Sequence, residues 1–228
     1  MNSTRMDRVS RWAELGLILG LATGFTVVAT AQSVDGRAFG TYVSTPLVSS
    51  ERSPLAALPA VSGTDGAEAD AQGSAVSVPS TLSSQFLNSI TSGALGTTEA
   101  GAQSTASAAS VNILNGLITA DEVIANVASS RTASGAVSNA DGSTLQNLVV
   151  AGVPVTTGDA AVAPNTQISL PGVGYVVLNE QIPSGDGVTS SGLTVNMIHV
   201  YLQSVSPLGG ATNTGEIIVG SATSSVAP

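Results

Sequence analysis

Hydrophobic and polar residues alternate along most of the chain beyond residue 36, with the two-residue period of a β-strand. The residues around Phe39, Thr41 and Val43 show this alternation before Pro46 interrupts it. Clusters of Gly, Pro, Asp and Ser separate the alternating runs, as turns between strands do. We therefore expect about nine strands with short connections, at residues 37–49, 71–79, 104–114, 117–128, 143–156, 166–170, 175–182, 193–205 and 214–223.

Three segments carry further local signals. Asn115-Gly116 stands between two apolar runs and predicts a hairpin, because both positions of such a turn adopt positive φ. Residues 80–95 have large apolar residues at near-helical spacing and predict one short helix. Residues 54–73 are rich in Ala, Pro, Gly, Ser and acidic residues, and we expect them to form a surface loop.

The predicted strands favour a single all-β domain over residues 32–228, built as an antiparallel β-sandwich or jelly roll. A β-solenoid is the alternative, because small residues and recurring turns suit its coils. No motif recurs in register along the chain, and this favours the sandwich.

The composition narrows the possible functions. Charged residues make up 9% of the chain, against about 25% in an average soluble domain, and the net charge is -9. All six basic residues are arginine, so the chain lacks the lysine and arginine clusters that bind nucleic acid phosphates. The absence of cysteine excludes disulfides, thiol catalysis and cysteine-ligated zinc.

The N-terminus predicts export. Several arginines precede an uncharged apolar run at residues 15–29, which ends in the small-x-small cleavage site Ala29-Thr30-Ala31. We expect residues 1–31 to be a signal peptide and the mature protein to be secreted or displayed on the cell surface, without a membrane segment. A retained transmembrane anchor is the alternative, although the apolar run is short for a span and contains glycines.

Four polar residues in apolar strands are the candidate binding residues: Asn179, Glu180, Asn196 and His199, the only histidine. They could line a binding site, or they could satisfy buried backbone groups near strand ends. The second interpretation is favoured, because buried polar groups need hydrogen-bond partners. We likewise expect His199 to have a structural role.

The expected hairpin geometry separates the histidine from its nearest acid. If the two strands pair around Gly187, His199 faces Val176 and Glu180 faces Val195. The two side chains would then lie roughly 13 Å apart along the strands. A direct hydrogen bond between them is therefore not expected.

Other chemistry receives little support. Asp65, Glu68 and Asp70 could hold Ca²⁺, but their spacing matches no EF-hand, and a solvated acidic loop is favoured. Glu180 and Glu216 are the only acids within long strand patterns, and the sequence does not place them together. Nucleophile elbows and phosphate-binding glycine loops are missing. We expect no enzyme activity, no cofactor and no bound metal.

Six segments of the mature chain carry a family resemblance: GRAFG at 36–40, SVNILNGLITA at 110–120, LQNLVVAG at 145–152, PGVGYVVLNEQ at 171–181, LTVNMIHV at 193–200 and EIIVGSA at 216–222. In their order and spacing, these segments resemble the choice-of-anchor P family of bacterial surface proteins. The resemblance implies an exported β-rich protein of the bacterial exterior, mainly from high-GC Gram-positive lineages, with no assigned activity. The family name records differing C-terminal anchors, and the residues after Ala222 show none.

Three functions remain open. The first is a non-catalytic exported structural or cell-surface protein that self-assembles into an oligomer or fibre through strand edges, with residues 39–49 as the expected edge. The second is a binding module for wall glycan or another surface protein. The third, less favoured, is a hydrolase that uses His199. The expected partners are therefore the protein itself or cell-envelope components, and not nucleic acid.

Overall fold

The computed structural model describes residues 32–205 and 209–228, and it confirms the predicted all-β class. These residues belong to one compact unit, built from two antiparallel sheets that we call sheet A and sheet B. The predicted signal peptide at 1–31 lies outside the described residues. In the described part of the chain, no helix is long and apolar enough to cross a membrane.

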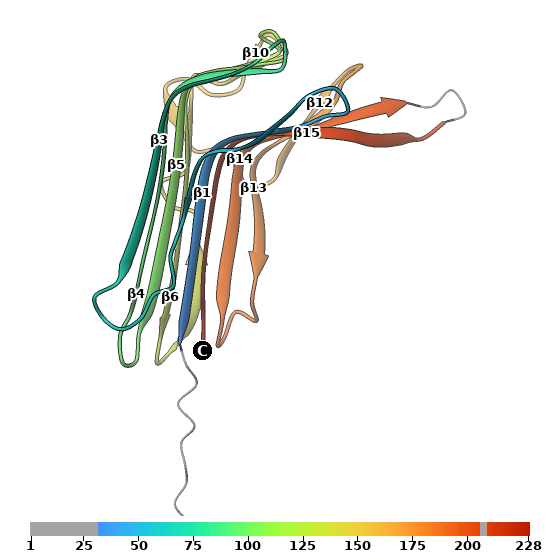
Figure 1. Ribbon diagram of the computed structural model, residues 1–228. Helices are drawn as coiled ribbons and strands as arrows, with labels where there is room; N and C mark the ends of the chain where they lie inside the picture. The colour runs from blue at the N-terminus through green and yellow to red at the C-terminus, as the bar shows by residue number, and fades with distance from the viewer. Residues whose placement is uncertain (1–31, 206–208) are drawn as a thin grey trace, which may run out of the picture. The chain divides into compact units, whose positions relative to one another are not determined.

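Sheet A contains the first two and the last four strands of the chain (Figure 1). The first strand and the last strand are neighbours, with Ser33 opposite Ala227. The order across sheet A is β12 (Thr166–Leu170), β13 (Gly174–Ser184), β14 (Ser191–Val205), β15 (Ala211–Ala227), β1 (Ser33–Ser44) and β2 (Ser49–Ala57).

Sheet B contains the strands between them, and its long strands follow one another as a meander. Its main order is β10 (Val153–Pro154), β9 (Val149–Val150), β6 (Ile118–Thr132), β5 (Ala100–Ile113), β4 (Leu82–Leu95) and β3 (Ala67–Val78). Three short strands lie off this path, namely β7 (Gly135–Asn139), β8 (Thr144–Gln146) and β11 (Asp159–Ala160). Every strand pair in the described residues is antiparallel, which excludes the β-solenoid alternative with its parallel coils.

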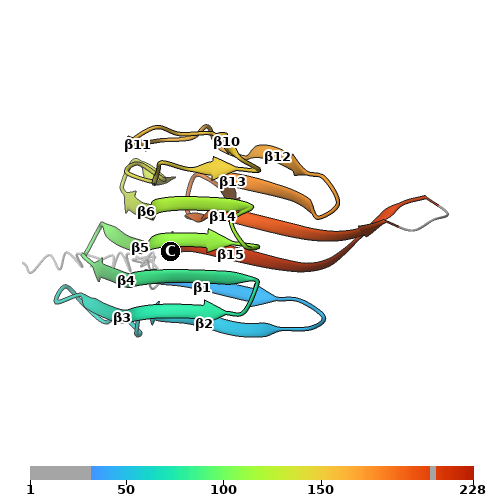
Figure 2. The ribbon, with the colours of Figure 1, turned by 90° about the horizontal axis from the view of Figure 1, so that it is seen from above.

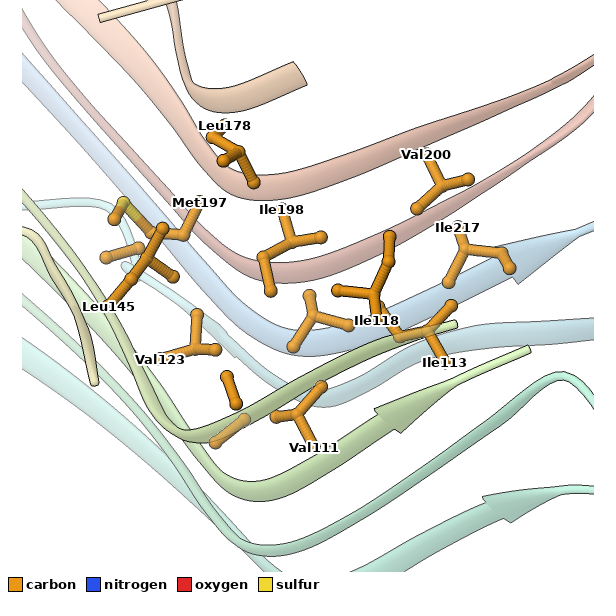
Figure 3. Close-up of a cluster of buried hydrophobic side chains, with 14 of the residues drawn as sticks. Val111, Ile113, Ile118, Val123, Leu145, Leu178, Met197, Ile198, Val200 and Ile217 are labelled. Atoms are coloured by element: carbon orange, nitrogen blue, oxygen red, sulfur yellow. The ribbon is translucent and has the colours of Figure 1, made fainter. Parts of the chain in front are cut away.

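Both sheets bend along a line that crosses their strands (Figure 1). In sheet A the pairing skips Asn179 and Gly220, which adopt left-handed φ angles of 48° and 67°. Met197 and Ile198 are adjacent in β14, yet both lie in the core (Figure 3). An undistorted strand would send them to opposite faces, so the side-chain alternation slips by one residue at the bend.

Sheet B has a matching interruption. Phe86 and Ser110 adopt φ angles of 50° and 52°, and the strand pairing skips both positions. The sheets approach closely here, because a Cβ added to Gly220 would lie 2.7 Å from Val123 Cγ1. Glycine at this position permits both the left-handed backbone and the close contact.

The bend divides the interior into two parts with different contents. On one side, large aliphatic side chains from both sheets fill the core (Figure 3). We call this part the aliphatic arm, defined by residues 111–113, 118–120, 198–200 and 217–219. Its buried side chains include Val111, Ile113, Ile118, Ile198, Val200 and Ile217.

On the other side, buried alanines are mixed with buried hydroxyl groups. Thr91 and Ser104 share a hydrogen bond of 2.8 Å between their hydroxyls. The Ser129 and Ser224 hydroxyls lie 2.7 Å apart and join sheet B to sheet A. We call this part the hydroxyl arm, defined by residues 89–91, 100–108, 123–129 and 222–226.

The predicted helix at 80–95 is wrong, because these residues form β4, a strand between β3 and β5. Leu82 and Ser84 are buried on one side of Phe86, and Leu87 and Ser89 on the other. The alternation of this strand was hard to recognise for two reasons. Some of its buried positions are serines, and the alternation shifts by one residue at Phe86. The remaining apolar residues consequently had a spacing close to that of a helix.

Two other local expectations need correction. The predicted loop at 54–73 shrinks to the connection at 58–66, because β2 ends at Ala57 and β3 begins at Ala67. The expected edge at 39–49 is not an edge, because β1 pairs with β15 on one side and β2 on the other. The predicted hairpin is confirmed between β5 and β6, where Asn115 and Gly116 both have positive φ.

Candidate functional site

The candidate site lies where the bend crosses β13, β14 and β15 of sheet A. Glu180 follows the left-handed Asn179 in β13, and it faces Asn196 of β14 directly. His199 lies on β14 beyond the slip in alternation, and Glu216 lies on β15. The structure therefore brings together the side chains of three predicted residues, Glu180, Asn196 and His199, and it adds Glu216 to them. The Asn179 side chain bonds the Val162 carbonyl and Gln181 instead.

The expected separation of His199 from Glu180 is wrong. His199 Nδ1 lies 2.7 Å from Glu180 Oε2. The register differs by one residue from the expected one, so His199 faces Val177 and Glu180 faces Asn196. The bend has the larger effect. Glu180 pairs with Asn196, and the side-chain alternation of β14 slips before His199, three residues further along. The side chains of His199 and Glu180 therefore lie on the same face of the sheet.

His199 is held between two carboxylates. Its Nδ1 contacts Glu180, and its Nε2 lies 3.0 Å from Glu216 Oε2. A carboxylate only accepts hydrogen bonds, and both imidazole nitrogens donate only in the imidazolium form. The two contacts therefore suit a histidine cation between two anions, with the imidazole side chain only 7% exposed.

Glu180 is the centre of the network. Its carboxylate also accepts hydrogen bonds from Asn196 Nδ2 at 2.8 Å and from the Tyr201 hydroxyl at 2.6 Å. Burial raises the pKa of Glu180, but hydrogen bonds from His199, Tyr201 and Asn196 together outweigh it and lower that pKa to about 2. Glu180 is consequently ionised at neutral pH.

Aromatic rings cover one side of the network. The Tyr201 ring stacks on His199 with centroids 4.0 Å apart, and Tyr175 stacks on Tyr201 at 4.7 Å. Burial, together with the adjacent Glu180, raises the pKa of Tyr201. The phenol therefore stays protonated and keeps its hydrogen bond to the carboxylate.

The two asparagines have different partners. Asn179 Nδ2 donates to the Val162 carbonyl at 2.7 Å, which fastens the segment before β12. Asn196 Oδ1 accepts from the Ser221 hydroxyl at 2.7 Å. Asn179 therefore bonds a backbone group, whereas Asn196 bonds the side chains of Glu180 and Ser221.

The network spans the bend. Glu180, Asn196 and Ser221 lie on the hydroxyl-arm side, whereas His199 and Tyr201 lie on the aliphatic-arm side. Hydrogen bonds between charged groups in a partly buried setting are stronger than neutral ones. The arrangement is suited to fixing the angle between the two arms.

The geometry is less suited to catalysis or metal binding. Both ring nitrogens of His199 contact carboxylates, so neither is placed to take a proton from a serine hydroxyl. Across residues 32–205 and 209–228, no group of three or more His, Cys, Asp or Glu side chains could hold a metal ion. Asp65, Glu68 and Asp70 are exposed, the first in a turn and the others on β3.

Sequence reasoning missed the contributions of Tyr201 and Glu216 to this network. Tyr201 carried a usable signal, because it follows His199 by two residues and therefore shares its face of β14. Glu216 stood out as an acid within a strand pattern, but only the register of β15 against β14, with Glu216 opposite Tyr201, brings it near the histidine.

A second polar-aromatic contact lies at the far side of sheet A. The Arg52 guanidinium lies 5.3 Å from the Phe39 ring centroid and 4.9 Å from that of Tyr42. Four of the five aromatic residues among the described residues belong to strands of sheet A, and none of them belongs to the core clusters. Most of the rings therefore gather on one sheet, outside the two core clusters.

Comparisons with known proteins place no further constraint on the function, since no protein-family model, curated protein or solved structure matches the chain.

Proposed function

We propose that the protein is an exported, non-catalytic structural protein of the bacterial cell surface, related to the choice-of-anchor P family. The proposed export rests on the order of arginines, apolar run and cleavage site in residues 1–31. The proposed structural role rests on the β-sandwich and on the network at its bend. Association of copies through a sheet edge is part of this proposal.

The main support for this proposal is that other side chains enclose the only histidine, His199. His199 has carboxylates on both ring nitrogens, a stacked tyrosine on one face and little exposure. A catalytic imidazole needs a nitrogen placed toward substrate or toward a nucleophile. The contacts of His199 instead link three strands of one sheet, which supports a structural role and disfavours the hydrolase.

Export is tested with the complete chain expressed in a high-GC Gram-positive host. The protein should accumulate in the medium or on the cell surface, and mass spectrometry should give an N-terminus at Gln32. A chain that retains Met1 in the membrane fraction would contradict cleavage and support an anchored form.

A wall-glycan binding module is the second candidate, favoured by the aromatic rings of sheet A. Aromatic side chains expose apolar faces beside polar groups, which is the chemistry that sugar rings present in return. Saturable binding to purified wall polymer would support this candidate, and Tyr42→Ala and Tyr175→Ala should weaken it. Phe86→Ala is the matched control, because Phe86 is 73% exposed on sheet B.

A further inference from the structure

The edges of the two sheets differ in how well they are protected. Among the described residues, β3, with 12 residues, is the longest strand that pairs with one other strand only, β4. The β2 edge carries Glu51, Arg52 and Pro54, and charges and proline discourage pairing with another chain. The β12 edge has only 5 residues.

The charges of β3 are confined to one end. Glu68 and Asp70 lie in its first third, whereas residues 71–78 contain no charged residue and no proline. Within the described residues, no strand pairs with the side of β3 that faces away from β4. An uncharged strand with an unpaired side is a template for adding another strand.

We infer that two copies of the chain associate through residues 71–78, paired antiparallel about a two-fold axis between Ser74 and Ala75. The inference deepens the edge association of the proposed function by naming the edge and the partner. Antiparallel pairing places Glu68 and Asp70 beyond the paired segment. Parallel pairing in register would instead set each acid against its own copy, which is unfavourable.

The bend in β3 is the reason for placing the two-fold axis between Ser74 and Ala75. The side-chain alternation of β3 slips at Ser74 and Ala75, which are both exposed, opposite the left-handed Phe86 of β4. A two-fold axis at this point continues the bend from one copy into the other. It also places Gln72 opposite Ser77 on the outer face, and Gly73 opposite Val76 on the inner face, so both faces match.

The same geometry limits the number of copies that can associate. Figure 2 shows β3 and β2 side by side at one margin of the two sheets. Pairing of β3 with its own copy uses the same edge on both chains, and such an interface closes at two copies. The expected assembly is a dimer and not a fibre. Because both copies carry net negative charge, added salt should strengthen the dimer by screening their repulsion.

The test uses the full exported protein in sedimentation velocity at physiological ionic strength. Ser74→Asp and Ser74→Lys each place like charges beside the axis, and each should weaken dimerisation about fivefold or more. An equimolar mixture of the two variants should dimerise again, because opposite charges then meet across the axis. This rescue by mixing is specific to a two-fold interface.

Ser83→Asp and Ser83→Lys are the matched controls. Ser83 is exposed on β4, which has neighbours on both sides, so neither variant nor their mixture should change the dimer. A protein that stays monomeric at high concentration and salt would refute edge association as a whole. If the Ser74 variants dimerise as strongly as the wild type, only the choice of β3 as the interface is refuted. If association continues beyond two copies into fibres, the closed dimer is refuted. The export test is independent of all three outcomes.

Discussion

The two arms of the interior are built from the same strands but are held together by different contacts. In the aliphatic arm, side chains such as Ile118 and Ile217 meet between the sheets without polar groups. In the hydroxyl arm, Ala106, Ala125 and Ser224 occupy the equivalent layer, and hydroxyl groups bond across it. The aliphatic arm gains stability from buried apolar area, whereas the hydroxyl arm gains it from hydrogen bonds between buried hydroxyl groups.

The difference explains how so few large residues can form a sandwich. Alanine, serine and glycine bury little apolar area, but they lose little side-chain entropy on folding. They also allow close contact: a Cβ on Gly36 would overlap the Thr91 hydroxyl. The hydroxyl arm should therefore tolerate loss of single contacts better than the aliphatic arm, and added volume worse. Four measurements test this difference between the arms.

The largest effect is expected where the arms meet. Gly220→Val should destabilise the fold by about 3 to 5 kcal/mol, because it combines a left-handed backbone with overpacking against Val123. Urea unfolding measures the change. Gly116→Val is the control, since Gly116 also has positive φ but its Cβ would meet nothing within 4 Å. Equal losses in both variants would mean that the close approach at the bend costs nothing.

The next effect is expected in the aliphatic arm. Ile118→Ala removes a fully buried side chain and should cost about 2 to 5 kcal/mol, from lost apolar burial and the cavity left behind. Unfolding in urea should show a lower midpoint with an unchanged slope. Ile182→Ala is the control, because Ile182 is 51% exposed. Similar costs at both positions would contradict the assignment of Ile118 to the core.

The third prediction concerns the link across the bend. Glu180→Gln should cost about 2 kcal/mol at neutral pH, because it removes the anion that His199, Tyr201 and Asn196 contact. The folded pKa of Glu180 lies below its ordinary value of 4.5, so its contribution is present above pH 4.5 and is lost as the pH falls toward about 2.

The measurement is urea unfolding of both proteins across that pH range. The difference between wild type and Glu180→Gln should shrink as the pH falls. Glu51→Gln on the exposed β2 edge is the control and should show no such trend. A constant difference at every pH would show that the cost of Glu180→Gln does not come from the carboxylate charge.

Simple alternation predicted the strands but not the bend, and the errors follow from that. The strand at 166–170 matches β12, and the hairpin around Asn115 is correct, because short-range patterns decide both. The helix error at 80–95 arose from a slip at Phe86. The missed contact between His199 and Glu180 arose from the equivalent slip in sheet A. The left-handed residues at the bend line up because the two sheets pack together. The sequence of a single segment does not show this packing.

The prediction of a sheet edge at residues 39–49 was wrong for a related reason. Its composition suits an edge, but whether a strand has one neighbour or two depends on the order of all the strands. The return of β15 to pair with β1 covers that side. The candidate residues Asn179, Glu180, Asn196 and His199 could be found as polar positions in apolar strands, whereas their joint geometry required the structure.

The smallest effect is expected in the hydroxyl arm. Ser129→Ala removes a hydroxyl that contacts the Ser138 and Ser224 hydroxyls and donates to the Ser224 carbonyl. Alanine fills almost the same volume, so no cavity forms, and the cost comes from leaving buried groups of Ser224 unpaired. We expect a loss of about 1 to 2 kcal/mol, measured by urea unfolding. Ser130→Ala is the control, because Ser130 is exposed and its change should stay within about 0.5 kcal/mol. If Ser129→Ala is neutral or stabilising, the buried hydroxyls contribute no more than alanine would, and the two arms differ in composition without differing in what holds them together.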